Sequence, residues 1–191
     1  APMIERLLDA GADPNVALPE GETPVMTASR TGNATAVRLL LDRGADLNVS
    51  EHSRGQTALM WAVAQGHHGI VATLLEHGAN VEARSKTRAR LMHADGTNGS
   101  QYDQGMMWNR GGFTPLLFAA RQGDINSATL LLAAGANIDE TAPTGATALV
   151  IATHSGHGAF AATLLDEGAD PNAAGAGYNA LHAAILRGDG T

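Results

Sequence analysis

The sequence predicts an all-α solenoid of stacked helix-turn-helix units joined by hairpin-like connections. Two observations carry this prediction. Nearly the same five-residue phrase, Gly-Ala-Asp or Gly-Ala-Asn followed by any residue and then Asn, Asp or Glu, begins at Gly11, Gly44, Gly78, Gly135 and Gly168. These glycines are separated by 33, 34, 57 and 33 residues. A period near 33 is typical of repeats that bury their apolar faces only against their neighbours, and the interval of 57 indicates an insertion.

A second motif marks the start of a first helix and lies roughly a dozen residues after each phrase, except after Gly78, where the insertion intervenes. A helix-capping residue followed by Pro or Ala recurs there, at Thr23, Thr57, Thr114, Thr147 and Asn179. The side-chain oxygen of such a residue accepts hydrogen bonds from free backbone N–H groups, and the fixed φ of proline suits the first helical position. We expect each first helix to end at a glycine that adopts the left-handed conformation. These glycines are Gly32, Gly66, Gly123, Gly156 and Gly188.

A second helix is predicted after each of these glycine turns. Segments such as residues 36–41 and 70–75 place apolar side chains at helical spacing on one stripe. Each second helix stops at the Gly-Ala phrase. From there an extended connection returns to the next capping residue.

A helix, a glycine turn, a second helix and an extended hairpin in about 33 residues resemble the ankyrin repeat, whose familiar cue is Thr-Pro-Leu-His with a downstream Gly-Ala-Asp. The resemblance covers nearly the whole chain. It implies one domain over residues 1–191 with four complete repeats plus a half repeat at each end. The half repeats are 1–15 and 173–191, the complete repeats are about 16–48, 49–82, 112–139 and 140–172, and the inserted arm is 83–111.

The histidine of the ankyrin cue survives only as His182. In the family this histidine helps to tie neighbouring hairpins together by hydrogen bonds. We therefore expect this array to rely more on apolar contacts between its units. The residues at the matching positions are Met26, Met60, Leu117 and Val150.

The two ends of the sequence fall in the middle of a repeat. Residues 1–15 supply only a second helix, and residues 173–191 supply only a first helix. The apolar Leu7, Leu8, Leu181 and Ile185 would therefore lie on half-built units. We expect the natural chain to continue beyond both ends, or the ends to meet a partner. The alternative is end-to-end stacking, in which two chains complete one repeat.

The arm at residues 83–111 departs from the rest of the chain in length and in charge. It holds about 24 extra residues, and loops longer than about 12 to 15 residues are usually functional or disordered. Its charged residues are Arg84, Lys86, Arg88, Arg90, Arg110, Asp95 and Asp103, a net charge of +3. The rest of the chain carries seven basic and seventeen acidic residues, a net charge of −10.

Three interpretations of this basic arm are open. In the leading one it grips a partner protein, with the arginines as bidentate donors and with adaptable apolar anchors. These anchors are Met92, Met106, Met107, Tyr102 and Trp108. In the second, the arm folds back onto its own array and pairs with neighbouring carboxylates. The third is nucleic-acid binding through arginines interleaved with Tyr and Trp, which the overall charge of −7 opposes.

The resemblance also implies that hairpin tips and the exposed faces of the first helices form one concave strip where partners bind. The candidate partner-binding residues of the strip and the arm are Glu22, Arg30, Gln56, Gln65, Arg84, Arg88, Arg90, Met92, Tyr102, Met107, Trp108, Phe113, Arg121, Gln122, His154 and Tyr178. Phe113 and Tyr178 are predicted as exposed aromatic anchors, with packing against the adjacent tip as the alternative. Trp61 and Phe118 lie deeper in their helices and are interpreted as packing residues.

Catalytic and cofactor chemistry have no support in the sequence. The absence of cysteine excludes disulfides and thiolate metal sites. Neither a Gly-x-Ser-x-Gly elbow nor a Gly-x-x-x-x-Gly-Lys phosphate loop is present, and the histidines near Gly66 and Gly156 fit the turns of the repeat itself. We therefore predict no catalytic residue, no cofactor and no metal site. The sequence contains no stretch of 18 apolar residues, so no membrane span is predicted.

The sequence thus predicts a non-catalytic protein–protein interaction module or an accessory subunit of a larger assembly. Its partner is another protein or subunit, whose identity the sequence does not specify. The alternative is a targeting or regulatory ankyrin region of a longer enzyme or receptor. Repeats rich in Ala, Leu, Arg and Asp, with a single lysine in the chain, resemble bacterial ankyrin arrays. Some of these are exported, so cytoplasmic and bacterial periplasmic or exported locations both stay open.

Overall fold

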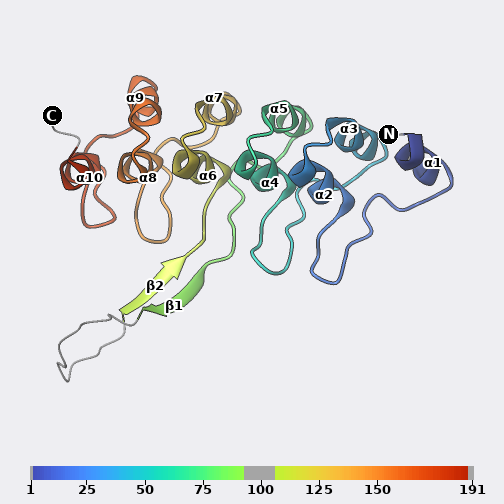
Figure 1. The fold of residues 1–191 in the computed structure, drawn as a ribbon, viewed down its shortest axis with the longest axis horizontal. Coiled ribbons are helices and arrows are strands. Elements are labelled where there is room, and N and C mark those ends of the chain that lie inside the picture. Colours follow the sequence, from blue (N-terminus) through green and yellow to red (C-terminus); the bar gives the residue numbers. More distant parts are fainter. Residues whose placement is uncertain (1, 93–105, 189–191) are drawn as a thin grey trace.

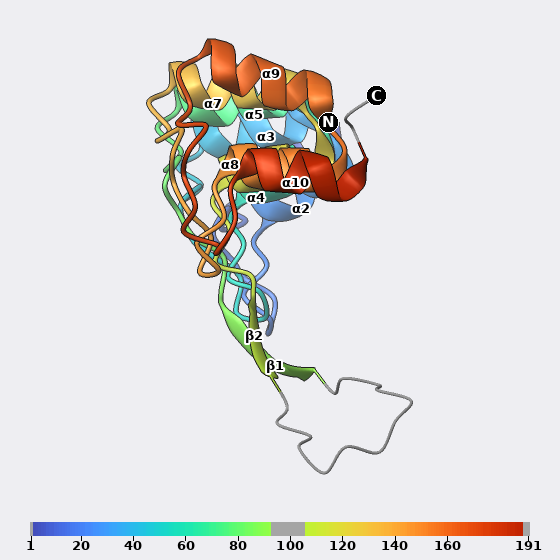
Figure 2. The same ribbon diagram turned by 90° about the vertical axis from the view of Figure 1, so that its left-hand side faces the viewer.

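Ten helices stack in two layers in the part of the chain that the computed structural model describes, residues 2–92 and 106–188. The first helices form one layer and the second helices the other, and the hairpins project from the layer of first helices (Figures 1 and 2). The first helices are α2 (Pro24–Thr31), α4 (Ala58–Ala64), α6 (Pro115–Gln122), α8 (Ala148–Ser155) and α10 (Ala180–Arg187). The second helices are α1 (Pro2–Asp9), α3 (Ala34–Asp42), α5 (His68–Glu76), α7 (Ile125–Ala133) and α9 (Gly158–Asp166). The predicted solenoid of helix pairs is confirmed.

The helix boundaries follow from the predicted caps. Thr57, Thr114, Thr147 and Asn179 each accept a hydrogen bond from the backbone N–H three residues further on. Thr23 is the exception, because its buried hydroxyl oxygen makes no hydrogen bond. All five glycines expected after the first helices have positive φ, between 69° and 83°. The turn between the two helices of each pair therefore forms as the sequence indicates.

The core runs without interruption through the stack, between the two helix layers and between successive units. It is filled mainly by Ala, Leu and Val, which suits the close spacing of short helices. The side chains at the positions of the ankyrin-cue histidine are all buried; they are Met26, Met60, Leu117 and Val150. Buried apolar side chains thus replace the cue histidine in these four units.

The Gly-Ala phrases bond to one another across every interface between successive phrases, and we call this set of bonds the phrase ladder. The last residue of each phrase accepts, through its side-chain oxygen, the backbone N–H of the third residue in the next phrase. The accepting and donating residues are Asn15 and Asp46 (2.7 Å), Asn48 and Asn80 (2.8 Å), Glu82 and Asn137 (2.8 Å), and Asp139 and Asp170 (2.9 Å). The third pair spans the insertion, so the stack continues past it in register.

A second set of bonds, the turn ladder, links the ends of neighbouring first helices. In each interface a side chain of the later unit donates to the carbonyl two residues before the turn glycine of the earlier unit. The donors and carbonyls are His67 and Arg30 (3.3 Å), Gln122 and Ala64 (3.0 Å), His157 and Arg121 (3.1 Å), and Arg187 and His154 (3.0 Å). The two turn histidines, His67 and His157, therefore have a structural role.

The arm is a lengthened hairpin between α5 and α6, and its two paired strands were not predicted from the sequence. Strands β1 (Arg88–Met92) and β2 (Met106–Arg110) pair antiparallel, with Arg88 opposite Arg110 and Met92 opposite Met106. They extend from the row of hairpins and project beyond it (Figure 1). The insertion thus prolongs a connection that every unit possesses.

Apolar side chains are exposed on both terminal helices, as the half repeats predict. Leu7 on α1 is 54% exposed and Leu181 on α10 is 66% exposed, whereas Leu8 is half-buried. A hollow of about 380 Å³ lies beside α1 and is lined largely by apolar residues of α1, α2 and α3. Within the described residues, none of the helices has the length and apolar character needed to cross a membrane.

We expect Asn48→Ala to lower the free energy of unfolding by about 1–2 kcal/mol, because it removes two hydrogen bonds between units. Asn48 Oδ1 accepts from Asn80, and its Nδ2 donates to the carbonyl of Gly78. Urea unfolding measures the change. Asn172→Ala is the matched control, since Asn172 ends the last phrase and its side chain bonds to no further unit in the described chain. Equal losses in the two variants would contradict the phrase ladder.

A methyl group at Gly123 should cost about 1–3 kcal/mol of unfolding free energy. The φ of Gly123 is +72°, and a Cβ there would lie 2.7 Å from the ring of His157. Thermal and urea unfolding of Gly123→Ala test this. In the control Gly69→Ala, a helical glycine with open space around it gains a better helix former, so stability should stay level or rise. A tolerated Gly123→Ala would refute the close approach.

Candidate partner-binding face

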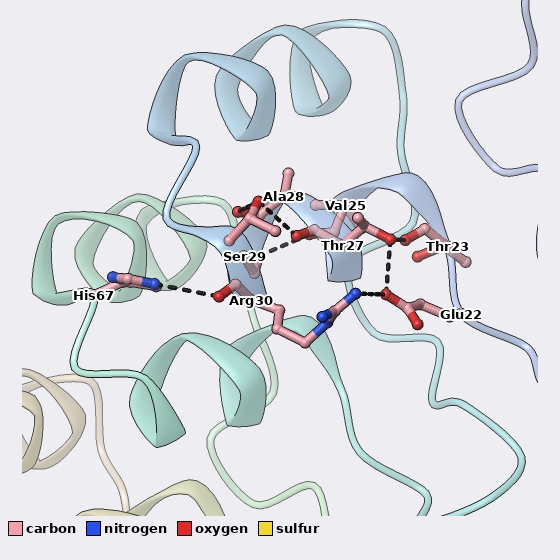
Figure 3. A network of polar contacts seen from close by, with 9 residues as sticks. Glu22, Thr23, Val25, Thr27, Ala28, Ser29, Arg30 and His67 are labelled. Atoms are coloured by element: carbon pink, nitrogen blue, oxygen red, sulfur yellow. Dashed lines mark hydrogen bonds and ion pairs between the residues drawn. The ribbon is translucent and has the colours of Figure 1, made fainter.

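The hairpins and the exposed residues of α2, α4, α6, α8 and α10 form one surface, which we call the hairpin face. At its N-terminal end Arg30, near the end of α2, bonds to Glu22 through Nη2 and Oε1 at 3.0 Å (Figure 3). Glu22 Oε1 also accepts from the hydroxyl of Thr27 at 2.8 Å. The Thr27 hydrogen bond, together with the charge of Arg30, lowers the pKa of Glu22 despite partial burial. This carboxylate and this guanidinium satisfy one another.

Trp61 joins this cluster from the next unit. The Arg30 guanidinium carbon lies 5.5 Å from the Trp61 ring centroid, within the range of a cation–π contact. Trp61 is half-buried and borders a hollow of about 230 Å³. The other residues lining the hollow are Glu20, Glu22, Glu51, Ser53 and Arg54. Trp61 packs against the core as predicted, but its contact with Arg30 on the hairpin face was not predicted.

The hairpin between α3 and α4 is organised around the buried carboxylate of Glu51, which is 4% exposed. Its oxygens accept the backbone N–H groups of Ser53 (2.6 Å), Arg54 (2.7 Å) and Gln56 (3.1 Å). Burial alone would raise the pKa of Glu51. The hydrogen bonds from Ser53, Gln56 and Arg54 outweigh burial, and the pKa lies below its ordinary value.

Gln56 corrects one prediction. It was expected to be exposed at the hairpin tip, but it is only 8% exposed. The turn that closes around Glu51 draws the Gln56 backbone inward, and the side chain is buried with it. Gln56 is therefore inaccessible to a partner in this structure.

A second cluster lies where the arm meets α6. The rings of Phe113 and Phe118 are 5.7 Å apart and meet edge to face at 71°. The guanidinium carbon of Arg121 lies 5.4 Å from the Phe113 centroid and 5.1 Å from that of Phe118. Phe113 is half-buried and packs against Phe118 of its own repeat, whereas the alternative stated for it was packing against the adjacent tip.

The C-terminal part of the hairpin face carries His154, which is exposed at the end of α8, and the half-buried Tyr178. Their ring centroids are 6.4 Å apart. Gln65 is exposed just after α4, whereas the Gln122 side chain belongs to the turn ladder. Tyr178 thus neighbours the first helix of the preceding unit.

The root of the arm is bonded to the hairpins on both sides. Arg84 donates to the carbonyls of Gly112 and Thr141, each at 2.9 Å, and pairs with the Glu140 carboxylate. On the other side, Lys86 Nζ donates to the His52 carbonyl at 2.6 Å and Arg88 donates to the Ser53 carbonyl. These contacts favour the folded-back interpretation for the root of the arm.

Further out along the arm, the structure describes the backbone of β1 and β2. Arg90 stands opposite Trp108, Leu91 opposite Met107, and Met92 opposite Met106. Tyr102 lies outside the described residues, together with the rest of 93–105. The predicted roles of Arg90, Met92, Tyr102, Met107 and Trp108 stay predictions.

A family model described as ankyrin repeats (3 copies) matches residues 1–85 and 116–190. The chain belongs to the ankyrin repeat family. Ankyrin repeats are generally protein–protein interaction modules, and the family is typically non-catalytic. The unmatched stretch contains the arm. No curated protein matches the chain.

Within residues 2–92 and 106–188, no three His, Cys, Asp or Glu side chains come together as a metal site. His68 Nε2 lies 2.8 Å from Asp124 Oδ1, and the same oxygen caps α7 through the N–H of Ser127. This pair joins two units of the stack.

Comparison of equivalent positions in the ankyrin repeats could have found the clusters that the sequence analysis missed. Trp61 and Phe118 are each the fourth residue of a first helix, and Arg30 and Arg121 are each the seventh. Each arginine lies against an aromatic ring at that fourth position, one in the next unit and one in its own. The periodicity carries this signal, although it does not reveal which ring the arginine will contact.

We expect Glu51→Gln to be less stable than wild type at neutral pH by about 1–3 kcal/mol, because N–H groups bond more strongly to a charged acceptor. Since the folded-state pKa of Glu51 is lowered, this advantage is fully present above the unfolded-state pKa and is lost as the pH falls through the folded-state pKa. Urea unfolding at neutral and acidic pH measures both effects. The exposed Glu5→Gln controls for net charge, and a wild-type advantage that does not shrink in acid would count against the Glu51 turn.

Proposed function

We propose that this array is a non-catalytic protein-binding module, and that its partner contacts the hairpin face and the arm together. The observation that carries the proposal is the anchored root of the arm. Arg84, Lys86 and Arg88 bond to the hairpins on either side, so the two strands extend from the hairpin face in a set direction. A partner bound to that face would also contact the arm, which would form one side of the binding site.

The residues available to the partner fit this proposal. Arg30 over Trp61 and Arg121 over Phe113 present flat, partly apolar surfaces with polar edges. Arginine and aromatic side chains of this kind are enriched at the energetic centres of protein interfaces. Beyond them, the strand register places Arg90 and Trp108 opposite each other on the arm.

Charge supports a protein partner over a nucleic acid. Phosphate binding requires several uncompensated cations, and the chain carries a net charge of −7. At the root of the arm, Arg84, Lys86 and Arg88 already donate to groups of the array itself. These three described cations are therefore not free to follow a phosphate backbone.

Replacing residues 89–109 by Asn-Gly tests the role of the arm. The strand register places Arg88 opposite Arg110. Asn-Gly favours a two-residue hairpin turn and would connect these two residues. The anchors at the root stay in place, so the unfolding free energy should change little. We expect affinity capture from a lysate of the source organism to recover the specific partner at least about tenfold less efficiently with this variant.

The control is Arg38→Glu on the exposed side of α3, among the second helices. This variant should capture the same proteins as wild type, because its site lies in the other helix layer. Equal recovery of the same proteins by the arm-shortened variant would disprove the arm as part of the interface. Loss of binding in Arg38→Glu alone would move the interface to the second helices.

A further inference from the structure

Two units of the array present the same arginine in different surroundings. Arg30 and Arg121 are each the seventh residue of a first helix, in α2 and α6. The residue immediately before the capping threonine is Glu22 in the earlier unit and Phe113 in the later one. The backbone framework is therefore repeated, while the side chain facing the arginine changes from a carboxylate to an aromatic ring.

This exchange leaves Arg121 without the partner that Arg30 has. Arg30 Nη2 bonds to Glu22 Oε1 at 3.0 Å. The Arg121 guanidinium lies against the rings of Phe113 and Phe118, and within the described part of the chain it donates to no carboxylate and no carbonyl. The Arg121 residue nonetheless keeps an exposed surface.

A guanidinium in this setting is suited to bind an anion. It offers five N–H donors in a planar fork that matches the two oxygens of a carboxylate. The two phenylalanine rings remove water from part of the group, and this burial lowers the pKa of Arg121. An anion at the open edge would restore the lost stabilisation of the charge, and its attraction would be less screened than in bulk water.

We propose that Arg121, supported by Phe113 and Phe118, binds the carboxylate of an aspartate or glutamate side chain on the partner protein. The array contains its own precedent, since the equivalent Arg30 holds the carboxylate of Glu22. This inference rests on the proposed function and adds to it the chemistry of the residue recognised.

The surroundings favour one acidic side chain over a polyanion. The chain as a whole carries a net charge of −7, so a phosphate backbone would be repelled. The site also adjoins the root of the arm. The backbone of Phe113 is held there by two hydrogen bonds with Ser85, of 2.9 and 3.0 Å. An acidic side chain bound at Arg121 would thus lie beside the first residues of the arm.

Side-chain NMR of arginine Nε–Hε groups tests this inference directly on the whole chain. The ligands are the blocked tripeptides Ac-Ala-Glu-Ala-NH₂ and Ac-Ala-Gln-Ala-NH₂, which differ in one carboxylate. We expect the glutamate peptide to shift the Arg121 signal with an affinity about tenfold or more above that of the glutamine peptide. The Arg30 signal serves as the internal control and should not move, because Glu22 already occupies Arg30.

Two substitutions exchange the surroundings of the two arginines. Phe113→Glu gives Arg121 an internal carboxylate, as in the first unit, and should abolish its response to the glutamate peptide. Glu22→Gln removes the internal carboxylate from Arg30 and should make Arg30 responsive. If Phe113→Glu fails to fold, the wild-type spectrum and the Glu22→Gln variant still decide the matter.

An unmoved Arg121 signal, or equal shifts with both peptides, would overturn the inference. A phosphoserine peptide or a thymidine oligonucleotide that binds Arg121 more tightly than the glutamate peptide would also overturn it and assign the site to phosphate. Failure here is distinguishable from failure of the proposed function. The peptide test depends on Arg121 alone, whereas the capture test depends on the arm.

Discussion

The phrase ladder is the constraint on which the other features of this structure depend. An isolated helix of seven to nine residues is marginal in water, so each unit is stable only when it is placed correctly on its neighbours. In every interface between successive phrases, including the one that spans the insertion, the backbone N–H of the third residue of the later phrase donates to the side chain of the last residue of the earlier one and helps to set that placement. Together with the apolar core and the turn ladder, the phrase ladder keeps the first helices regularly spaced, and the hairpin face depends on that spacing.

The same constraint explains why a long insertion is tolerated at this point in the chain. The bond between Glu82 and Asn137 closes the stack on one edge, and the bond between Gln122 and Ala64 closes it between α4 and α6. The hairpin lies outside both closures, and lengthening a surface connection costs little further entropy. Its basic residues, unusual for the chain, bond to carbonyls and to Glu140 at the root and thereby limit its directions.

The helices could be predicted because their signals are local: a capping residue, an apolar stripe and a glycine turn lie within a dozen residues of one another. The strands of the arm, the burial of Gln56 and the cation–π contacts of Arg30 and Arg121 were not predicted. Gln56 is buried because the Glu51 carboxylate accepts three backbone N–H groups of the same turn. No single residue of the sequence predicts that geometry. The ring that Arg30 contacts belongs to the next unit, at a distance that only the stacked structure defines.

A repeat protein also provides an internal reference for judging its own exceptions. Between the α2 and α6 units, the capping threonine, the proline and the arginine are the same, and the exchange of Glu22 for Phe113 stands out against them. A carboxylate at position 113 would satisfy Arg121 within the chain, as Glu22 satisfies Arg30. A guanidinium without an internal carboxylate lacks the stabilisation of that ion pair, and natural proteins commonly accept such a loss where a site must remain available. The exchange in the third complete repeat is therefore the departure from the repeated pattern that supports the binding role proposed for Arg121.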